Sequence, residues 1–411
     1  MESNNKKMIK NSTMMFIMNL AKMVFPFITL PYLTRVLSTN AYGTVAYVKT
    51  MMSYMQIIVD FGFALSATRD IVQEKSNRIK LGFVVGNTLL GKMLLGGIAF
   101  IVLIIVSLCL PILKNNLLFT LLSYLVVFES IFLMDFLFRG LEIMHIITIR
   151  FILMKTISTV LTFCMVRNDK DILLIPILDI IGSFAAIVLV FLEVKKLHIK
   201  PRCSGLRKTW RTIKHSFVYF LSNVASTSFN LVSTLIIGVQ LSETEVAYWS
   251  VCMQVATTIQ SCYIPIADGI YPQMIKTKSV GLIKRVIKIF FPVVCISSVL
   301  AYFWAEVGMY LLGGEEYVIA APIFRLLIPI LVFGFLGVIM GWPALDAIGK
   351  AKEVTISTVL AMLVQLLLLI MLLLCHKFTL EYLAVVRSIT ELVFFNIRFY
   401  FVRKYKYLFA D

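Results

Sequence analysis

Long apolar runs separated by short polar stretches form the dominant pattern of this chain. A run of about 20 apolar residues is what an α-helix needs to cross the roughly 30 Å hydrocarbon core of a bilayer. Twelve segments fit this pattern, at residues 11–33, 41–64, 81–110, 117–138, 143–166, 172–192, 213–239, 246–270, 286–312, 323–345, 354–374 and 380–402. The pattern therefore predicts an all-α integral membrane protein with twelve transmembrane helices.

Composition supports the membrane interpretation. The 411 residues are 60% hydrophobic and only 15% charged, whereas soluble domains are about 45–50% apolar and about 25% charged. The net charge of +17 raises the question of nucleic acid, but nucleic-acid binding needs a basic patch on a folded polar domain. No segment is polar enough to build one. We expect membrane lipids around the chain and no nucleic-acid partner.

The basic residues define the predicted domains and their orientation. Six apolar segments precede and six follow a basic stretch, which predicts an N-terminal bundle at 1–194, a linker at 195–214 and a C-terminal bundle at 215–411. Lysine and arginine gather at the N-terminus, in this linker and in every second loop, and such loops face the cytoplasm. Both termini are therefore predicted to be cytoplasmic. Because no small-residue cleavage site follows Lys6, Lys7 and Lys10, the first helix is predicted to stay uncleaved.

A short repeat links the two predicted bundles. Leu37-Ser38-Thr39, leading to Ala41-Tyr42, is echoed by Leu241-Ser242-Glu243, leading to Ala247-Tyr248. Both copies lie between the first two helices of their half. Halves of six helices share one topology, so we expect them to be related by an axis along the membrane normal.

Charges inside the apolar segments are the candidate functional residues, because each costs about 2.5–3.5 kcal/mol on insertion scales unless it is paired or hydrated. The cations in question are Lys22, Lys49, Lys92, Arg150 and Lys155, and the acids at comparable depth are Glu129 and Asp179. The excess of cations favours an anionic passenger such as a phosphate or diphosphate. In the alternative reading the cations pair with Glu129, Asp179 or helix C-termini, or reach an interface. That alternative is favoured for Arg150, and the cavity reading for Lys22 and Lys49.

The remaining polar residues indicate structure more than chemistry. Arg387 and Glu391 lie four residues apart on one helix face and form a predicted structural ion pair. Asp60 and Asp268 lie near cytoplasmic helix ends, where we expect capping or pairing with basic loops. The glycines at 82, 86 and 91 predict a close helix contact. The seven cysteines form no CxxC pair and the four histidines are scattered, so neither a metal site nor an enzyme is expected.

The N-terminal region resembles a known family. The run PYLTRVLSTNAYGTVAYV, followed by VDFGFALSATRDI, is similar to the first two helices and following loop of bacterial polysaccharide repeat-unit flippases. These are the O-antigen and capsule transporters of the multidrug/oligosaccharidyl-lipid/polysaccharide exporter superfamily. The predicted helix number, orientation and paired bundles fit this superfamily over the whole chain.

The resemblance implies a specific activity. Such proteins move an undecaprenyl-diphosphate-linked oligosaccharide across the bacterial plasma membrane by alternating access, with the head group in a central cavity. It implies that Lys22, Lys49 and Lys92, and secondarily Arg150 and Lys155, contact the diphosphate or sugar. It also implies coupling to a proton or sodium gradient without a bound cofactor, with Glu129 and Asp179 as candidate coupling residues. A polysaccharide polymerase and a chain-length regulator are the protein partners that it implies.

Three alternatives remain at this stage. A drug/cation antiporter of the same superfamily shares the fold but should carry net acidic charge in its cavity. A lipid II flippase usually has two further helices. A membrane enzyme such as a polysaccharide polymerase or ligase should show a long outer loop with catalytic arginine or histidine, and the outer loops here are short.

Overall fold

The computed structural model describes residues 2–410, except for the side chains of residues 2–9, 218 and 222. Lys6 and Lys7 therefore lie outside the described side chains. Within residues 2–410 the chain is helical almost throughout and forms no strand; a single backbone bridge joins Ser279 to Ala410. The chain divides into two units, residues 1–224 and 225–411.

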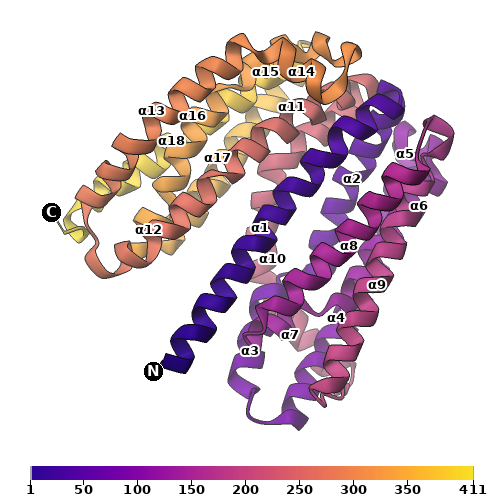
Figure 1. Ribbon diagram of the computed structural model, residues 1–411, viewed down its shortest axis with the longest axis vertical. Helices are drawn as coiled ribbons and strands as arrows, with labels where there is room; N and C mark the ends of the chain where they lie inside the picture. The colour runs from indigo at the N-terminus through magenta and orange to yellow at the C-terminus, as the bar shows by residue number, and fades with distance from the viewer. Residues whose placement is uncertain (1, 411) are drawn as a thin grey trace. The chain divides into compact units, whose positions relative to one another are not determined.

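The first unit is a bundle of long helices with short helices at its ends (Figure 1). Its elements are α1 (Glu2–Val36), α2 (Thr39–Asp60), α3 (Phe63–Glu74), α4 (Arg78–Cys109), α5 (Pro111–Asn115), α6 (Leu117–Glu129), the 3-10 helix η1 (Ser130–Leu133), α7 (Asp135–Gly140), α8 (Met144–Met165) and α9 (Leu174–Lys196). α8 packs along α9 on one side and α1 on the other. α8 therefore occupies a central place among the helices that carry candidate residues.

The second unit repeats the pattern of long helices. After α10 (Leu206–Gln240), which begins in the first unit and ends in the second, come α11 (Glu243–Ser261), α12 (Tyr263–Thr277), α13 (Val280–Phe303), α14 (Ala305–Gly313), α15 (Ala321–Leu327), α16 (Pro329–Ile339), α17 (Ala351–Leu374) and α18 (Leu380–Lys404). α18 packs against both α16 and α17. Its polar residues therefore lie inside this unit.

Nine helical segments in the described chain are long and apolar enough to cross a membrane. The protein is thus a multi-pass membrane protein. The other three predicted crossings correspond to α2, to α11 with α12, and to α18, which are helical but more polar. α2 contains Lys49, and α18 contains Arg387, Glu391 and Arg398. Twelve crossings and cytoplasmic termini remain predictions.

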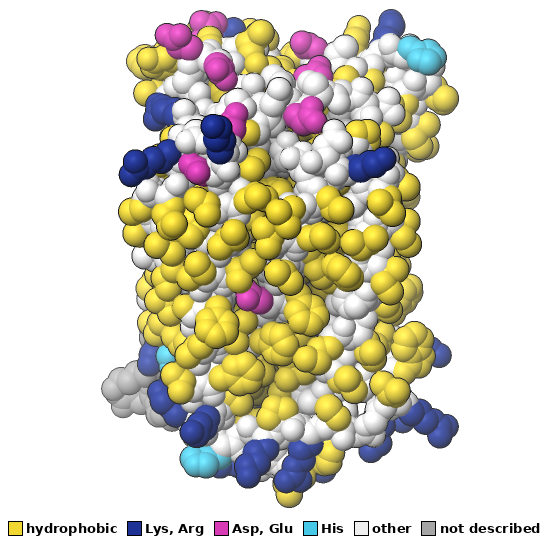
Figure 2. All heavy atoms as spheres, turned by 90° about the vertical axis from the view of Figure 1, so that its right-hand side faces the viewer, with side chains coloured by type: hydrophobic (Ala, Val, Ile, Leu, Met, Phe, Trp, Pro, Cys, Tyr) yellow, Lys and Arg dark blue, Asp and Glu magenta, His cyan; other side chains and the backbone are white. Residues whose placement is uncertain are grey.

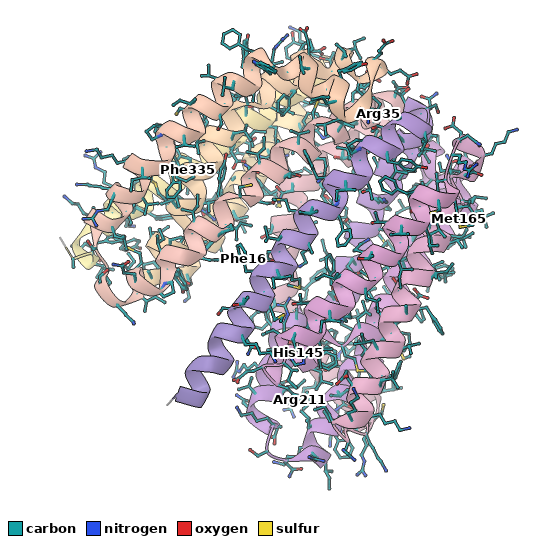
Figure 3. All side chains as sticks on the ribbon, in the orientation of Figure 1. Phe16, Arg35, His145, Met165, Arg211 and Phe335 are labelled. Carbon is teal, nitrogen blue, oxygen red and sulfur yellow. The ribbon has the colours of Figure 1, made fainter. Side chains whose placement is uncertain are left out.

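The surface and the helix ends agree with a membrane protein. On the face drawn in Figure 2, hydrophobic side chains form a broad band, and lysine and arginine side chains gather at its lower end. In the first unit, Arg35 and Met165 lie at one end, and His145 and Arg211 lie at the other (Figure 3). The turn after α1 and the linker therefore lie at opposite ends of the first unit, as the predicted alternation of outer and cytoplasmic loops requires.

The two copies of the short repeat perform the same structural task. Ser38 caps α2, accepting a hydrogen bond from the Ala41 backbone N–H. Ser242 caps α11 in a capping box with Glu245. A serine cap satisfies one of the free N–H groups of a helix start. Each copy follows a helix of 35 residues, α1 in one unit and α10 in the other.

A tight turn at Asp60-Phe61-Gly62 separates α2 from α3, where the sequence predicted one helix running to residue 64. Phe61 and Gly62 both have positive φ, at 39° and 79°. This conformation ends the helix and is strained for any residue with a side chain. Phe61 then stacks on Phe220 of α10, with ring centroids 4.3 Å apart.

Replacing Gly62 with alanine is expected to prevent stable folding. A Cβ at Gly62 would lie 2.5 Å from the Tyr219 Cβ and 2.9 Å from the Ser216 carbonyl oxygen, and the positive φ adds strain. We expect little monodisperse protein and a lower melting temperature in detergent. Gly97 is the control, because a Cβ there meets nothing described within 4 Å; Gly97→Ala should leave stability equal or raise it by about 0.5–1 kcal/mol. Equal behaviour of the two variants would contradict this account.

The glycines of α4 have a different role from the predicted one. The backbone of linker residues Lys200 and Arg202 packs directly against Gly82 and Gly86. The Arg202 N–H donates to the Gly82 carbonyl at 2.8 Å, and the Ser204 N–H donates to Asn87 Oδ1 at 2.9 Å. The prediction of a helix contact was therefore wrong for these two glycines. These contacts hold linker residues 197–205 against α4, and we call this stretch the strap.

Candidate functional site

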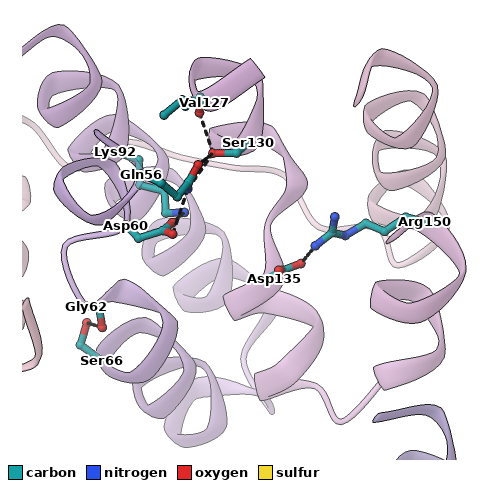
Figure 4. Close-up of polar contacts among 9 residues, drawn as sticks. All are labelled: Gln56, Asp60, Gly62, Ser66, Lys92, Val127, Ser130, Asp135 and Arg150. Atoms are coloured by element: carbon teal, nitrogen blue, oxygen red, sulfur yellow. Dashed lines mark hydrogen bonds and ion pairs between the residues drawn. The ribbon is translucent and has the colours of Figure 1, made fainter. Parts of the chain in front are cut away.

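Lys92 is held in a buried polar network at one end of α2. Its Nζ lies 2.7 Å from Oδ1 of Asp60, and Gln56 Nε2 donates to the other carboxylate oxygen at 2.9 Å. Gln56 also hydrogen bonds with Ser130 of η1 (Figure 4). Because Lys92 is only 6% exposed and has its own counter-ion, its main task is to hold α2, α4 and η1 together. Asp60 thus pairs within the bundle, where a basic loop was the expected partner.

Arg150 belongs to a cationic group between α1, α7 and α8. Its guanidinium forms an ion pair with Asp135 (Figure 4), which lies on α7. Lys22 of α1 is exposed, sits 5.9 Å from the Phe151 ring centre, and lies close enough to Arg139 and Arg150 to be repelled by both. Three cations thus share this region with the Asp135 carboxylate. We call Lys22, Arg139, Arg150 and Asp135 the inner charge group.

Lys49 and Lys155 meet at a second group with Asp179. Lys155 Nζ lies 3.6 Å from the Asp179 carboxylate, and Ser158 Oγ donates to the same oxygen at 2.5 Å. Lys49 interacts electrostatically with both Asp179 and Lys155. The side chain of Lys155 is 37% exposed and Lys49 is also exposed. We call Lys49, Lys155, Ser158 and Asp179 the outer charge group.

Glu129 is the predicted acid whose carboxylate has an enclosed oxygen without a described partner. It is the last residue of α6 and is half-buried. Its Oε2 is enclosed and has no hydrogen-bond partner among the described residues. A carboxylate in such a place is costly when ionised. Glu129 is therefore the candidate best placed to exchange a proton.

The two charge groups define what the first unit can do chemically. Each has more ammonium or guanidinium groups than carboxylates, and each includes an exposed lysine. Arg150 and Lys155 are five residues apart on α8, about 7.5 Å along its axis. The first unit therefore offers two successive positions for an anion. Within the described residues no cluster of three or more His, Cys, Asp or Glu side chains could hold a metal ion.

Comparison with known proteins identifies the family. The sequence profile of the family described as "Polysaccharide biosynthesis protein" matches residues 8–278. The chain belongs to this family. It is 28% identical over 272 residues to a Shigella dysenteriae protein named "Putative O-antigen transporter", covering 66% of this chain and 68% of that one. A protein of the same name from Escherichia coli (strain K12) is 23% identical over 300 residues, covering 73% and 72%.

Solved structures show the same fold as this polysaccharide biosynthesis protein. The lipid II flippase MurJ in an inward closed conformation superposes with a TM-score of 0.74 at 16% identity, covering 96% of this chain and 87% of the other. An inward-facing transporter of the multidrug resistance MATE family superposes with a TM-score of 0.65 at 13% identity, covering 94% and 98%. The predicted all-α membrane fold and the resemblance to polysaccharide transporters are confirmed, whereas the twelve crossings and the cytoplasmic termini stay predictions. This chain is a multi-pass protein of the bacterial inner membrane.

Sequence reasoning missed the partners of the candidate cations. Arg139 and Asp135 are not among the candidate residues that the sequence singles out. Their spacing of four residues places both on one helix face, which is the signal that links them. Asp60 was assigned to a helix end, and nothing in the local pattern shows that Lys92 reaches it from α4.

Arg398 of the second unit was also missed. It is 5% exposed, donates from Nη1 to the Gly337 carbonyl at 2.7 Å and from Nε to Ser357 at 3.0 Å. The predicted pair of Arg387 and Glu391 is confirmed at 2.7 Å. Arg387 and Arg398 are eleven residues apart, which returns to the same helix face. The hydrogen bonds of Arg398 join α18 to α16 and α17. We therefore assign a structural role to Arg387, Glu391 and Arg398.

Proposed function

We propose that this protein is a flippase that moves an undecaprenyl-diphosphate-linked oligosaccharide across the plasma membrane for O-antigen or capsule synthesis. The observation that carries the proposal is the excess of cations in the inner and outer charge groups of the first unit. A diphosphate is the part of such a passenger that costs most to bring into the membrane. Lysine and arginine side chains at two depths reduce that cost.

The geometry ranks the candidate contact residues. Lys22, Lys49 and Lys155 have exposed side chains and are the primary contacts in this proposal. Arg150 is buried and paired with Asp135, so it adds positive charge to the inner charge group, but its side chain does not extend towards the passenger. Lys92 is the weakest of the five, because Asp60 neutralises it. Alternating access would carry the head group from the inner to the outer charge group.

The relatives and the fold support transport over catalysis. The matching proteins carry transporter names, and the structural neighbours include a lipid flippase. The MATE family transporters share the fold, so the fold alone does not identify the transported molecule. A cationic drug would be repelled by the two charge groups, whereas an anionic head group would be attracted. The polymerase and the chain-length regulator remain predicted partners.

Coupling to a proton or sodium gradient is part of the proposal. Glu129 has the geometry of a proton carrier, with one enclosed oxygen that lacks a described partner. Asp179 is instead held by Ser158 and Lys155. We therefore place coupling at Glu129 and assign Asp179 the task of balancing Lys49 and Lys155.

Complementation tests the proposal directly. In a strain that lacks its own flippase and makes the matching repeat unit, the wild-type gene should restore surface polysaccharide. Lys22→Ala and Lys49→Ala should each reduce it about tenfold at equal protein level, as expected when about 1.4 kcal/mol of interaction with the passenger is lost. Lys114→Ala, which removes an exposed lysine of α5, is the control. Full complementation by both test variants would refute the role of these cations.

A further inference from the structure

The first part of α10 extends beyond the segment that crosses the membrane. The helix runs from Leu206 to Gln240, and Lys214 is the last charged residue before its uncharged part. Its 35 residues correspond to about 52 Å, against a hydrocarbon core of about 30 Å. About 15 residues therefore continue past the core. We call residues 206–221 the α10 entry segment.

The buried face of the entry segment fixes its position against the first unit. Thr209 and Ile213 pack over Gly91 of α4. One turn further on, Ser216 Oγ lies 2.6 Å from Ser66 Oγ of α3. These contacts place the segment at the end of the unit where α2 gives way to α3, which is the predicted cytoplasmic side.

The strap holds the start of the same segment. Linker residues 197–205 follow α9, and the hydrogen bonds of Arg202 and Ser204 tie them to α4. The Asn87 amide also donates to Ser204 Oγ at 3.3 Å. The entry segment is thus held near both ends by contacts within the first unit. Its outward side chains are held in place by the fold.

The outward side of the entry segment carries an apolar stripe. Leu206, Trp210, Phe217 and Leu221 are 65%, 65%, 51% and 59% exposed. At about 100° per residue they fall within about 60° of one another on the helix. Leu206 and Trp210 precede Lys214, the last charged residue of the helix. A stripe that includes an exposed tryptophan at a membrane edge is typical of contact with the lipid interface.

Four exposed cations lie on the same helix, namely Arg207, Lys208, Arg211 and Lys214. At about 100° per residue, Lys214, Arg207 and Arg211 lie about 20–80° beyond the edge of the stripe, and Lys208 lies about 140° beyond it. None has an ion-pair partner among the side chains that the structure describes. The nearby carboxylate is Asp70 of α3, which interacts with His215 and Arg69. Burial raises the pKa of Asp70 above its usual value, and His215 and Arg69 partly oppose this rise.

We propose that the α10 entry segment is a binding surface for anionic phospholipid of the cytoplasmic leaflet. The apolar stripe rests on the acyl-chain boundary, and the four cations hold phosphate head groups beside it. Charge complementarity selects this occupant, because the cytoplasmic leaflet is negative and each nearby lysine or arginine adds to the attraction. Bound lipid would stabilise the junction between the strap, α3 and α10.

Lipid retention by the purified full-length protein tests this proposal. Native mass spectrometry in detergent, with phosphatidylglycerol titrated against phosphatidylcholine, counts the lipids that stay bound. The variant R207Q/K208Q/R211Q/K214Q should need about tenfold more phosphatidylglycerol for equal occupancy. The control K114Q/R167Q/K170Q/K377Q removes four cations from loops that the positive-inside pattern predicts on the opposite side of the membrane, and it should match wild type. Equal retention by the α10 variant and wild type would overturn the proposal.

Two further measurements keep the result decisive. The charge-preserving variant R207K/K208R/R211K/K214R should retain lipid as wild type does, which separates charge from folding damage. If the fourfold glutamine variant does not stay monodisperse, the pairs R207Q/K208Q and R211Q/K214Q replace it, and each should show a smaller loss. Displacement of phosphatidylglycerol from wild type by inorganic pyrophosphate would contradict the proposal, because the surface would then select a soluble diphosphate.

Discussion

The double variant Lys49→Gln/Lys155→Gln is expected to abolish transport and to lower the melting temperature. Removing both lysines leaves Asp179, which is 20% exposed, without its two cations. An enclosed carboxylate that loses both cations and keeps only the Ser158 hydroxyl costs about 1–3 kcal/mol. Adding Asp179→Asn removes that charge as well, so the triple variant should recover most of the stability.

The comparison of the two variants separates structure from transport. The triple variant should fold normally and still fail to restore surface polysaccharide, because the anion-binding lysines are absent. Surface polysaccharide is measured by complementation, and stability by thermal unfolding in detergent at equal protein concentration. Recovery of transport in the triple variant would show that the two lysines serve only to neutralise Asp179.

A large loss of stability is expected for Glu391→Gln in the second unit. Glu391 is 3% exposed and pairs with Arg387, which is 1% exposed. It also contributes electrostatically at Arg398. Its loss leaves two buried guanidinium groups without a carboxylate, and breaking a buried pair in this way costs about 3–5 kcal/mol. The melting temperature should fall sharply, with loss of protein at growth temperature.

An exposed ion pair provides the control for this variant. Glu306 pairs with Arg325 at 2.8 Å, and its side chain is 58% exposed. Exposed pairs contribute about 0–1 kcal/mol, so Glu306→Gln should unfold close to the wild-type temperature. Similar losses in the two variants would mean that the α18 pair is not the structural element described here.

The sequence predicted the membrane class, the helices and the family because these depend on local patterns. Apolar run length determines where helices can cross a membrane, and the motif around Ser38 reappears as helix caps in both units. The turn at Asp60-Phe61-Gly62 was not predicted as a break. Its positive φ values depend on close packing against α10, which the order of residues around Gly62 does not reveal.

The sequence predicted the depth of the candidate residues in the membrane, but not the direction of their side chains. Residue spacing places Lys22, Lys49 and Lys92 inside the membrane, but it does not show the direction of each side chain. Lys92 reaches Asp60 across 32 residues of sequence, and Lys155 reaches Asp179 across a loop. Pairings of this kind arise when helices pack. The excess of cations was therefore visible in the sequence, while their division into two groups required the structure.

A reconstituted transport measurement tests the central claim most directly. Purified protein in liposomes would be supplied with a fluorescent undecaprenyl-diphosphate-linked oligosaccharide, and its appearance in the opposite leaflet would be followed by a membrane-impermeant quencher. The account predicts that wild type moves this lipid across the bilayer, and that Lys22→Ala and Lys49→Ala each move it about tenfold more slowly. Movement at wild-type rate by both variants, or movement of a cationic drug in place of the lipid by wild type, would contradict the account.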